Sequence, residues 1–199
     1  MEREPRNYIS LIDSYLALDN RRFIDYDGRE INVEELCGTG DISVTFDTDI
    51  LEDTLKSGVS LLALRDEQVI GFFSGDIDTK KNVLISEYTC ATGGKKTGEL
   101  LGYYALLKAY EINDKITLMT GSASGGIPAI EKEDSKEVVK KKSAALLNYH
   151  LKRGANLVGK IFTYTLTTVV KNIESLSRGS SKKKKKKTKG KKRTTRRNF

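Results

Sequence analysis

Hydrophobic residues recur along the chain at spacings that predict a mixture of helices and strands. Apolar positions three and four residues apart are typical of a buried helix face, and they predict helices at 8–18, 99–110 and 138–152. Runs of β-branched and aromatic residues predict strands at 59–65, 69–75, 83–90, 115–120 and 157–170. Weaker patterns predict short helices at 33–37 and 48–56 and a short strand at 42–46.

The order of these elements predicts how the strands pair. Three polar residues separate the strands at 59–65 and 69–75, so we expect an antiparallel hairpin, and the strand at 83–90 follows a second turn. A helix separates that strand from the one at 115–120, and strands joined through a helix are usually parallel. The pattern therefore predicts an α+β fold whose sheet is mostly antiparallel.

A turn with three glycines and two lysines joins the strand at 83–90 to the helix at 99–110. The glycines let an anion approach the main chain, the lysines add positive charge, and the free amides at the start of the helix favour a phosphate. An ordinary strand-to-helix connection explains the same glycines equally well. The spacing fits neither a Walker loop, which needs Ser or Thr directly after Gly-Lys, nor the dinucleotide fingerprint.

Basic residues are concentrated at the C-terminal end of the chain. The 199 residues include 35 Lys and Arg against 27 Asp and Glu, and 13 of the basic residues lie in 178–199, where no acidic residue occurs. Without that segment 22 basic and 27 acidic side chains remain, a net charge of −5. We expect residues 1–174 to form one domain and residues 175–199 to be a disordered basic tail.

The basic tail suggests a polyanionic partner. A flexible polycation without aromatic residues between its charges binds nucleic acid with little sequence preference, so residues 178–197 predict non-specific binding of nucleic acid. The same run of basic residues also fits a nuclear import signal. A solubilising extension with no specific partner is the simpler alternative. In composition the tail is similar to tails of small proteins from large DNA viruses of protists.

The cysteines and the N-terminal residues predict an intracellular protein, in the cytoplasm or nucleus. Cys37 and Cys90 are too few for a disulfide framework, so we interpret them as free thiols in a reducing compartment, while a single bridge between them stays open. The N-terminal residues lack the apolar run of a signal peptide, and no stretch reaches the roughly 18 apolar residues of a membrane span. We therefore expect no secretion and no membrane contact. The oligomeric state is open.

The order of elements and three motifs resemble the GNAT acyltransferase superfamily over about residues 9–166. The strand Val69-Ile-Gly-Phe-Phe is similar to the family's third strand, and residues 94–101 resemble the loop that binds the diphosphate of acyl-coenzyme A. Residues 144–157 are similar to the late helix that carries the family tyrosine. The resemblance implies a mixed, mostly antiparallel sheet with helices on both faces and a central parallel strand pair.

The resemblance also implies acetyl-coenzyme A as cosubstrate and an amine as acceptor, which is a small molecule, a polyamine or a protein. The residues that would bind acetyl-coenzyme A are Tyr88, Thr89, Gly93, Gly94, Lys95, Lys96, Thr97, Gly98 and Glu99. Glu87, the one acid in the central strand, is the candidate base, and Tyr149 is the candidate acid with His150 as its competitor. A purely structural role is the simpler interpretation for each of these three residues taken alone. An acidic cluster at 131–134 would attract a cationic acceptor.

Four positions depart from the family's pattern. In the loop, Gly93 stands where Gln or Arg is usual and Lys96 stands at the middle glycine. In the late helix, His150 stands at the place of the tyrosine, and Ala155 replaces the aromatic residue after the helix-stopping glycine. The altered loop at Lys96 favours the alternative that the protein is a GNAT-like module without catalysis that binds nucleic acid or another polyanion through its tail. His150 is the only histidine, so we expect no His-based metal site and no Ser-His-Asp triad.

Overall fold

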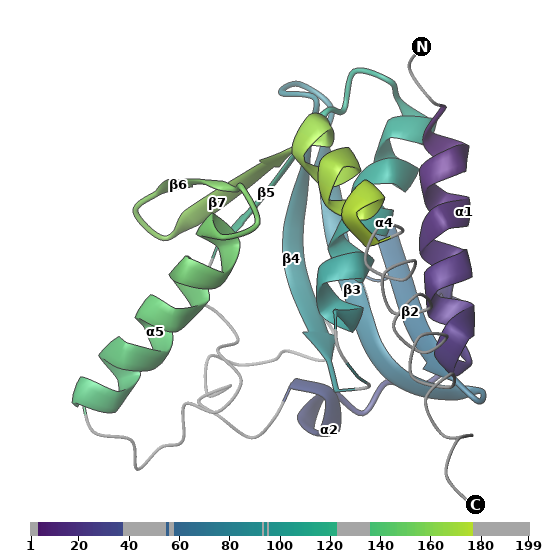
Figure 1. The fold of residues 1–199 in the computed structure, drawn as a ribbon, viewed down its shortest axis with the longest axis horizontal. Helices are drawn as coiled ribbons and strands as arrows, with labels where there is room; N and C mark the ends of the chain where they lie inside the picture. Colours follow the sequence, from purple (N-terminus) through teal and green to yellow (C-terminus); the bar gives the residue numbers. More distant parts are fainter. Residues whose placement is uncertain are drawn as a thin grey trace, which may run out of the picture.

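The structure, a computed structural model, describes residues 4–37, 55, 58–92, 94, 96–122 and 136–176 (Figure 1). Its elements in chain order are α1 (Pro5–Leu16), η1 (Ala17–Asp19), β1 (Arg21–Asp25), α2 (Val33–Cys37), β2 (Val59–Arg65), β3 (Gln68–Asp78), β4 (Val83–Ala91), α4 (Thr97–Ile112), β5 (Leu118–Ser122), α5 (Lys136–Leu151), β6 (Asn156–Val158) and β7 (Ile161–Thr165). A C-terminal helix follows at 166–176.

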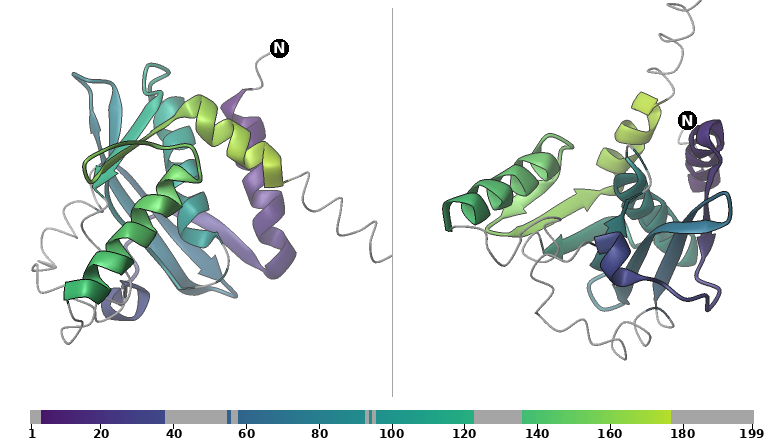
Figure 2. Two further views of the ribbon diagram at one scale, coloured as in Figure 1. Left: turned by 60° about the vertical axis from the view of Figure 1, so that its left-hand side comes forward. Right: turned by 90° about the horizontal axis from the view of Figure 1, so that it is seen from below.

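Within the described ranges the strands form one seven-stranded sheet in the order β1-β2-β3-β4-β5-β7-β6. β4 and β5 are parallel, and every other neighbouring pair is antiparallel. The predicted α+β fold with a mixed sheet and a parallel pair is thereby confirmed. β1 was not predicted, because it is short and begins with two arginines. Figure 2 shows α5 and the β6–β7 hairpin at the end of the sheet far from α1.

Two apolar clusters lie on opposite faces of the sheet. α1, α4 and the C-terminal helix cover one face, and most of α4 between Leu100 and Ala109 is buried. α4 is therefore enclosed on more sides than the single apolar stripe in its sequence indicates. The smaller cluster joins α2 to the other face through Leu36, Leu62 and Phe72.

The C-terminal helix corrects the strand that the sequence predicts at 157–170. The strand β7 ends at Thr165, and residues 166–176 are helical. Val169, Ile173 and Leu176 are buried in the α4-side cluster, and their spacing of four and three places them on one helix face. Burial of this face outweighs the strand preference of β-branched residues. The predicted domain boundary at 174 lies inside this helix. The strand predicted at 42–46 and, except for residue 55, the helix predicted at 48–56 lie outside the described residues.

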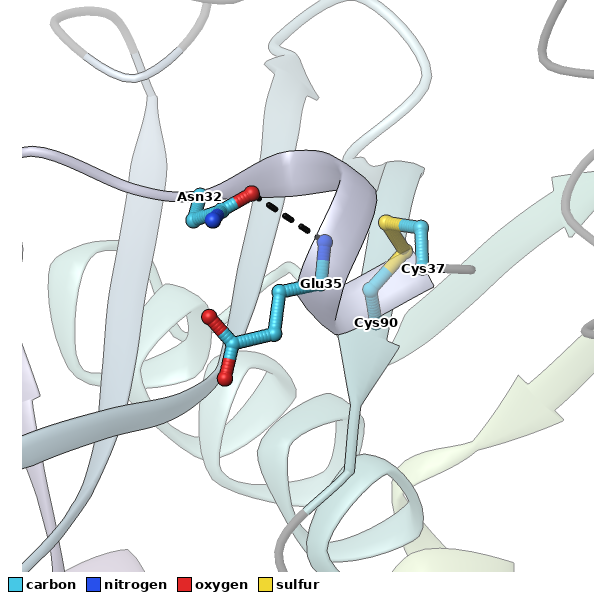
Figure 3. The surroundings of a disulfide bond; sticks show 4 residues. All are labelled: Asn32, Glu35, Cys37 and Cys90. Carbon is cyan, nitrogen blue, oxygen red and sulfur yellow. Dashed lines mark hydrogen bonds between the residues drawn. A yellow bond between two sulfur atoms is a disulfide. The ribbon is translucent and has the colours of Figure 1, made fainter. Parts of the chain in front are cut away.

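Cys37 and Cys90 form a disulfide, so the interpretation of both as free thiols was wrong (Figure 3). Their Cα atoms are 5.0 Å apart, and the bridge connects the last residue of α2 to the end of β4. α2 has only five residues, and the amide of Glu35 donates to Asn32 Oδ1 at 3.1 Å at its start. The expectation of a reducing compartment loses the observation on which it rested. No helix in the described part of the chain is long and apolar enough to span a bilayer.

Candidate active site

The parallel strands β4 and β5 separate partway along β4. Residues 83–86 of β4 pair with residues 118–121 of β5, and the last pair is Ser86 with Gly121. β4 nevertheless continues to Ala91. Figure 1 shows β5 leading away from this half of β4. A strand that outlasts its neighbour presents main-chain donors and acceptors to any ligand that extends along it.

A β-bulge marks the point where the two strands separate. On the β3 side, Ser86 lies opposite Gly75 and Tyr88 lies opposite Ser74, which makes Glu87 the extra residue. Bulges increase the local twist of a strand and occur often beside active sites. The bulge therefore gives a physical reason why the parallel pairing with β5 ends here.

The bulge also changes which side chains face which layer. Leu84 lies in the α4-side cluster, whereas Tyr88 and Cys90 pack in the α2-side cluster. Under strict alternation all three would share one face. The extra residue thus turns Thr89 and Ala91 toward α4, and it turns Cys90 toward its disulfide partner.

α4 begins close to the end of β4. A Cβ added at Gly98 would lie 3.8 Å from Ala91 Cβ and from Thr89 Cγ2. Gly98 and Glu99 are the second and third residues of α4, and first-turn amides of a helix have no partner within the helix. With the positive end of the helix dipole they make this turn suited to an anion.

Lys96, the residue predicted to stand at the middle glycine of the loop, is exposed and directly precedes α4, with a left-handed backbone (φ 72°). Two of the predicted loop residues, Gly93 and Lys95, lie outside the described residues.

An ion pair joins the first turn of α4 to the end of α5. Arg153 Nε donates to Glu99 Oε2 at 2.6 Å, and the Glu99 side chain is 7% exposed. The Tyr103 hydroxyl donates to the other carboxylate oxygen of Glu99 at 3.2 Å. Asn172 of the C-terminal helix donates to the Tyr103 hydroxyl at 2.8 Å and to the Arg153 carbonyl at 2.9 Å. These contacts hold the end of α5 against the start of α4.

Both candidate acids lie in this region. The Arg153 guanidinium carbon is 3.5 Å from the centre of the Tyr149 ring, a distance typical of a cation–π contact. The His150 ring stacks on Phe162 with 4.1 Å between ring centres. His150 Nδ1 also shares a 3.0 Å hydrogen bond with the Tyr164 hydroxyl.

Phe162 connects this group to the point where β4 and β5 separate. Phe162 is the β7 register partner of Gly121. A Cβ at Gly121 would lie 2.6 Å from Phe162 Cζ and 3.1 Å from the Ser86 carbonyl oxygen, so only glycine fits without a shift. The stacked ring of His150 is therefore separated from the last β4–β5 pair by a single aromatic side chain.

Burial shifts the pKa values of these groups in opposite directions. Burial, followed by the Glu99 carboxylate, raises the pKa of Tyr149 to about 12. Burial, followed by the Arg153 charge, lowers the pKa of His150 to about 4. At neutral pH Tyr149 is therefore protonated and His150 is neutral. A protonated phenol can donate a proton, whereas His150 is not an imidazolium donor at this pH.

Glu87, the candidate base, is an exposed residue at the bulge. Partial burial, followed by the nearby Asp76 carboxylate, raises the pKa of the Glu87 carboxyl. A carboxylate with a raised pKa accepts a proton more readily near neutral pH. Within the described residues no hydrogen bond joins Glu87 to Tyr149 or His150.

The structure thus brings together Glu99, Tyr149 and His150 from separate parts of the chain, beside the unpredicted Arg153 and Tyr164. Arg153 directly precedes Gly154 (φ 79°), a position that predicts the end of the preceding helix but not a role in the site. The acidic cluster at 131–134 lies outside the described residues. Across those that are described, no three His, Cys, Asp or Glu side chains lie close enough to hold a metal ion.

Comparison with solved structures identifies proteins of the same architecture. The structure is similar to a putative GNAT acetyltransferase from Desulfovibrio desulfuricans, with a TM-score of 0.52 and 9% identity over 73% of this chain and 98% of that one. It is also similar to a GNAT acetyltransferase from Elizabethkingia anophelis with acetyl-coenzyme A bound, with a TM-score of 0.49 and 12% identity over 74% and 99% of the two chains. No protein-family model matches the sequence, and neither does any curated protein. The chain therefore has the fold of the GNAT acetyltransferases, as its sequence motifs predict.

Proposed function

We propose that this protein transfers an acetyl group from acetyl-coenzyme A to an amine. The observation that carries the proposal is the position of β4 beyond Ser86, where its pairing with β5 in the described residues has ended: this part of the strand lies beside the first turn of α4. A strand edge and a helix N-terminus at one place suit a ligand with an amide-rich arm and a diphosphate. The exposure of Lys96 is compatible with the proposal, because a side chain in solvent can turn away from the diphosphate.

Each part of the cosubstrate has a group that would hold it. The main chain of residues 87–91 would bind the two amides of the pantetheine arm in the manner of an added strand. The amides of Gly98 and Glu99 would bind the diphosphate. Gly98 lets the diphosphate approach, because it has no side chain.

The reaction needs a deprotonated amine, a proton acceptor and a proton donor. The amine attacks the thioester carbonyl carbon, a C–N bond forms, the C–S bond breaks, and the thiolate of coenzyme A leaves. Glu87 would accept the proton from the amine, directly or through water, and its raised pKa suits that role. Tyr149, whose pKa near 12 keeps it protonated, would protonate the leaving thiolate, and this favours Tyr149 over His150 as the acid.

The acceptor is best sought among cationic amines. The chain without residues 178–199 carries a net charge of −5, which favours the approach of positively charged molecules. Polyamines and lysine-containing peptides combine positive charge with a primary amine. Neutral aromatic amines serve as the comparison class, because they gain nothing from this charge.

Ligand-dependent melting tests binding of the cosubstrate. A ligand at one hundred times its dissociation constant stabilises a protein by about 2.7 kcal/mol, which is a clear shift in melting temperature. We expect this shift with acetyl-coenzyme A and none with adenosine. An unchanged melting temperature at millimolar acetyl-coenzyme A would refute the proposal.

Two phenylalanine variants test the proton donor by mass-spectrometric detection of the acetylated amine. Tyr149→Phe should lower kcat by about 100-fold or more while the KM for acetyl-coenzyme A changes little. Tyr110→Phe, near the opposite end of α4, is the matched control and should behave as the wild type. Equal rates for Tyr149→Phe and the control would remove Tyr149 from the mechanism.

A further inference from the structure

β1 begins with a buried arginine that reaches the start of α4. The side chain of Arg21 is 3% exposed. Its Nε donates to Asp19 Oδ1 at 2.7 Å, and its Nη1 donates to Thr97 Oγ1 at 2.7 Å. A buried guanidinium is tolerated only where ionic and hydrogen-bonding partners compensate for the loss of water. Arg21 therefore forms a fixed connection between the first strand and the first residue of α4.

Thr97 also forms a hydrogen bond with the turn before α4. Its hydroxyl accepts the hydrogen bond from Arg21 and donates one to the Gly94 carbonyl at 3.3 Å. The Thr97 amide donates to the same carbonyl at 3.5 Å. Gly94 (φ 112°) and Lys96 (φ 72°) both have left-handed backbones. A non-glycine residue keeps such a backbone only where its surroundings hold it there.

A second arginine lies against the same turn. Arg65 is the β2 register partner of Arg21, and its Nη2 is 3.6 Å from Asp19 Oδ2. A Cβ added at Gly94 would lie 2.9 Å from Arg65 Nη2 and 3.9 Å from Arg21 Nη1. Like charges directly opposite each other on paired strands lower the stability of a sheet. Two guanidinium groups are nevertheless placed beside the turn that leads into α4.

We infer that Arg21 is a positioning residue for the diphosphate of the cosubstrate, and that it acts through the Thr97 hydroxyl. The hydroxyl fixes the Gly94 carbonyl and with it the course of the turn, so that the amides of Gly98 and Glu99 keep one direction. This inference rests on the proposed function, because it concerns the diphosphate of acetyl-coenzyme A. Arg21 and Thr97 touch the turn and not the reacting atoms.

Isosteric variants of Thr97 separate positioning from general damage. Thr97→Val keeps the shape of the side chain and loses both hydrogen bonds of the hydroxyl, whereas Thr97→Ser keeps both. We expect Thr97→Val to bind coenzyme A about tenfold more weakly, which corresponds to the loss of one hydrogen bond between an amide of the first turn and the charged diphosphate. Thr97→Ser should bind as the wild type. S-Acetyl-pantetheine, which lacks the diphosphate, should bind all three proteins equally.

The neighbouring arginines supply a matched pair for the same comparison. Arg21→Gln should weaken coenzyme A binding without changing the binding of S-acetyl-pantetheine. Arg22→Gln is the control, since the Arg22 side chain is 56% exposed and pairs with Glu67 on the surface. Arg22→Gln should bind both ligands as the wild type does.

A measurement without ligand distinguishes failure of the inference from failure of the proposed function. Amide hydrogen exchange across residues 94–100 should be faster in Thr97→Val than in Thr97→Ser. Unchanged exchange, or equal weakening toward both ligands, would overturn the inference while the proposed function stands. If the wild type binds neither coenzyme A nor S-acetyl-pantetheine, the proposed function fails and the diphosphate role of Arg21 fails with it.

Discussion

Opening the disulfide between Cys37 and Cys90 should lower stability by an amount that follows from the structure. The bridge joins residues 53 positions apart, and it restricts the unfolded chain by closing a loop of that length. In the chain-entropy model a loop of this size contributes about 4 kcal/mol to the free energy of unfolding. For a domain of this size the melting temperature should therefore fall by roughly 8–16 °C on reduction.

Melting curves with and without a phosphine reductant measure this change directly. Cys37→Ala supplies the control, because a reductant has no bond to break in that variant and should leave its melting temperature unchanged. Thiol titration of the unreduced protein in denaturant should find no free thiol. Two free thiols per chain, or a reductant effect no larger in the wild type than in Cys37→Ala, would refute the assignment of the bridge.

Three further predictions concern the proposed site and the basic segment. Gly98→Ala should fold at least as stably as the wild type, because the added Cβ makes only ordinary contacts. The variant should nevertheless bind coenzyme A more weakly, because the methyl group would contact the diphosphate. Unchanged affinity by calorimetry would contradict this prediction. The rate of acetyl transfer should rise with pH as Glu87 loses its proton. Asp76→Asn should move this rise to lower pH, because it removes a negative charge that raises the pKa of Glu87. A pH–rate profile of Asp76→Asn identical to that of the wild type would exclude Glu87 as the base. Deletion after Leu176 should abolish salt-sensitive retention on nucleic acid while melting stays unchanged, and retention by the shortened chain would assign binding elsewhere.

The parts of the fold that the sequence predicted are those set by local patterns. The hairpin of β2 and β3 follows from two apolar runs and a short polar turn, and the parallel placement of β5 follows from the helix before it. The parts that were missed depend on contacts between distant segments. The local sequence of the C-terminal helix favours a strand, and the burial of Val169 and Ile173 in the α4-side cluster outweighs that preference.

The candidate site was predicted in the same uneven way. Glu99, Tyr149 and His150 were named from motifs, but the ion pair from Glu99 to Arg153 spans 54 positions and has no local signal. The hydrogen bond from Arg21 to Thr97 joins residues 76 positions apart, and no local sequence pattern predicts it. The bulge at Glu87 depends on register with β3, which periodicity within one strand does not define.

Because Glu87 is an extra residue in β4, the number of residues in this strand determines which face each later side chain occupies. Removing one residue near it would exchange the inward and outward sides of everything that follows on the strand. Cys90 would then face away from Cys37, and Thr89 would leave the neighbourhood of Gly98. A one-codon deletion here would thus separate α2 from β4 and at the same time change the strand edge to which we propose that the pantetheine arm binds.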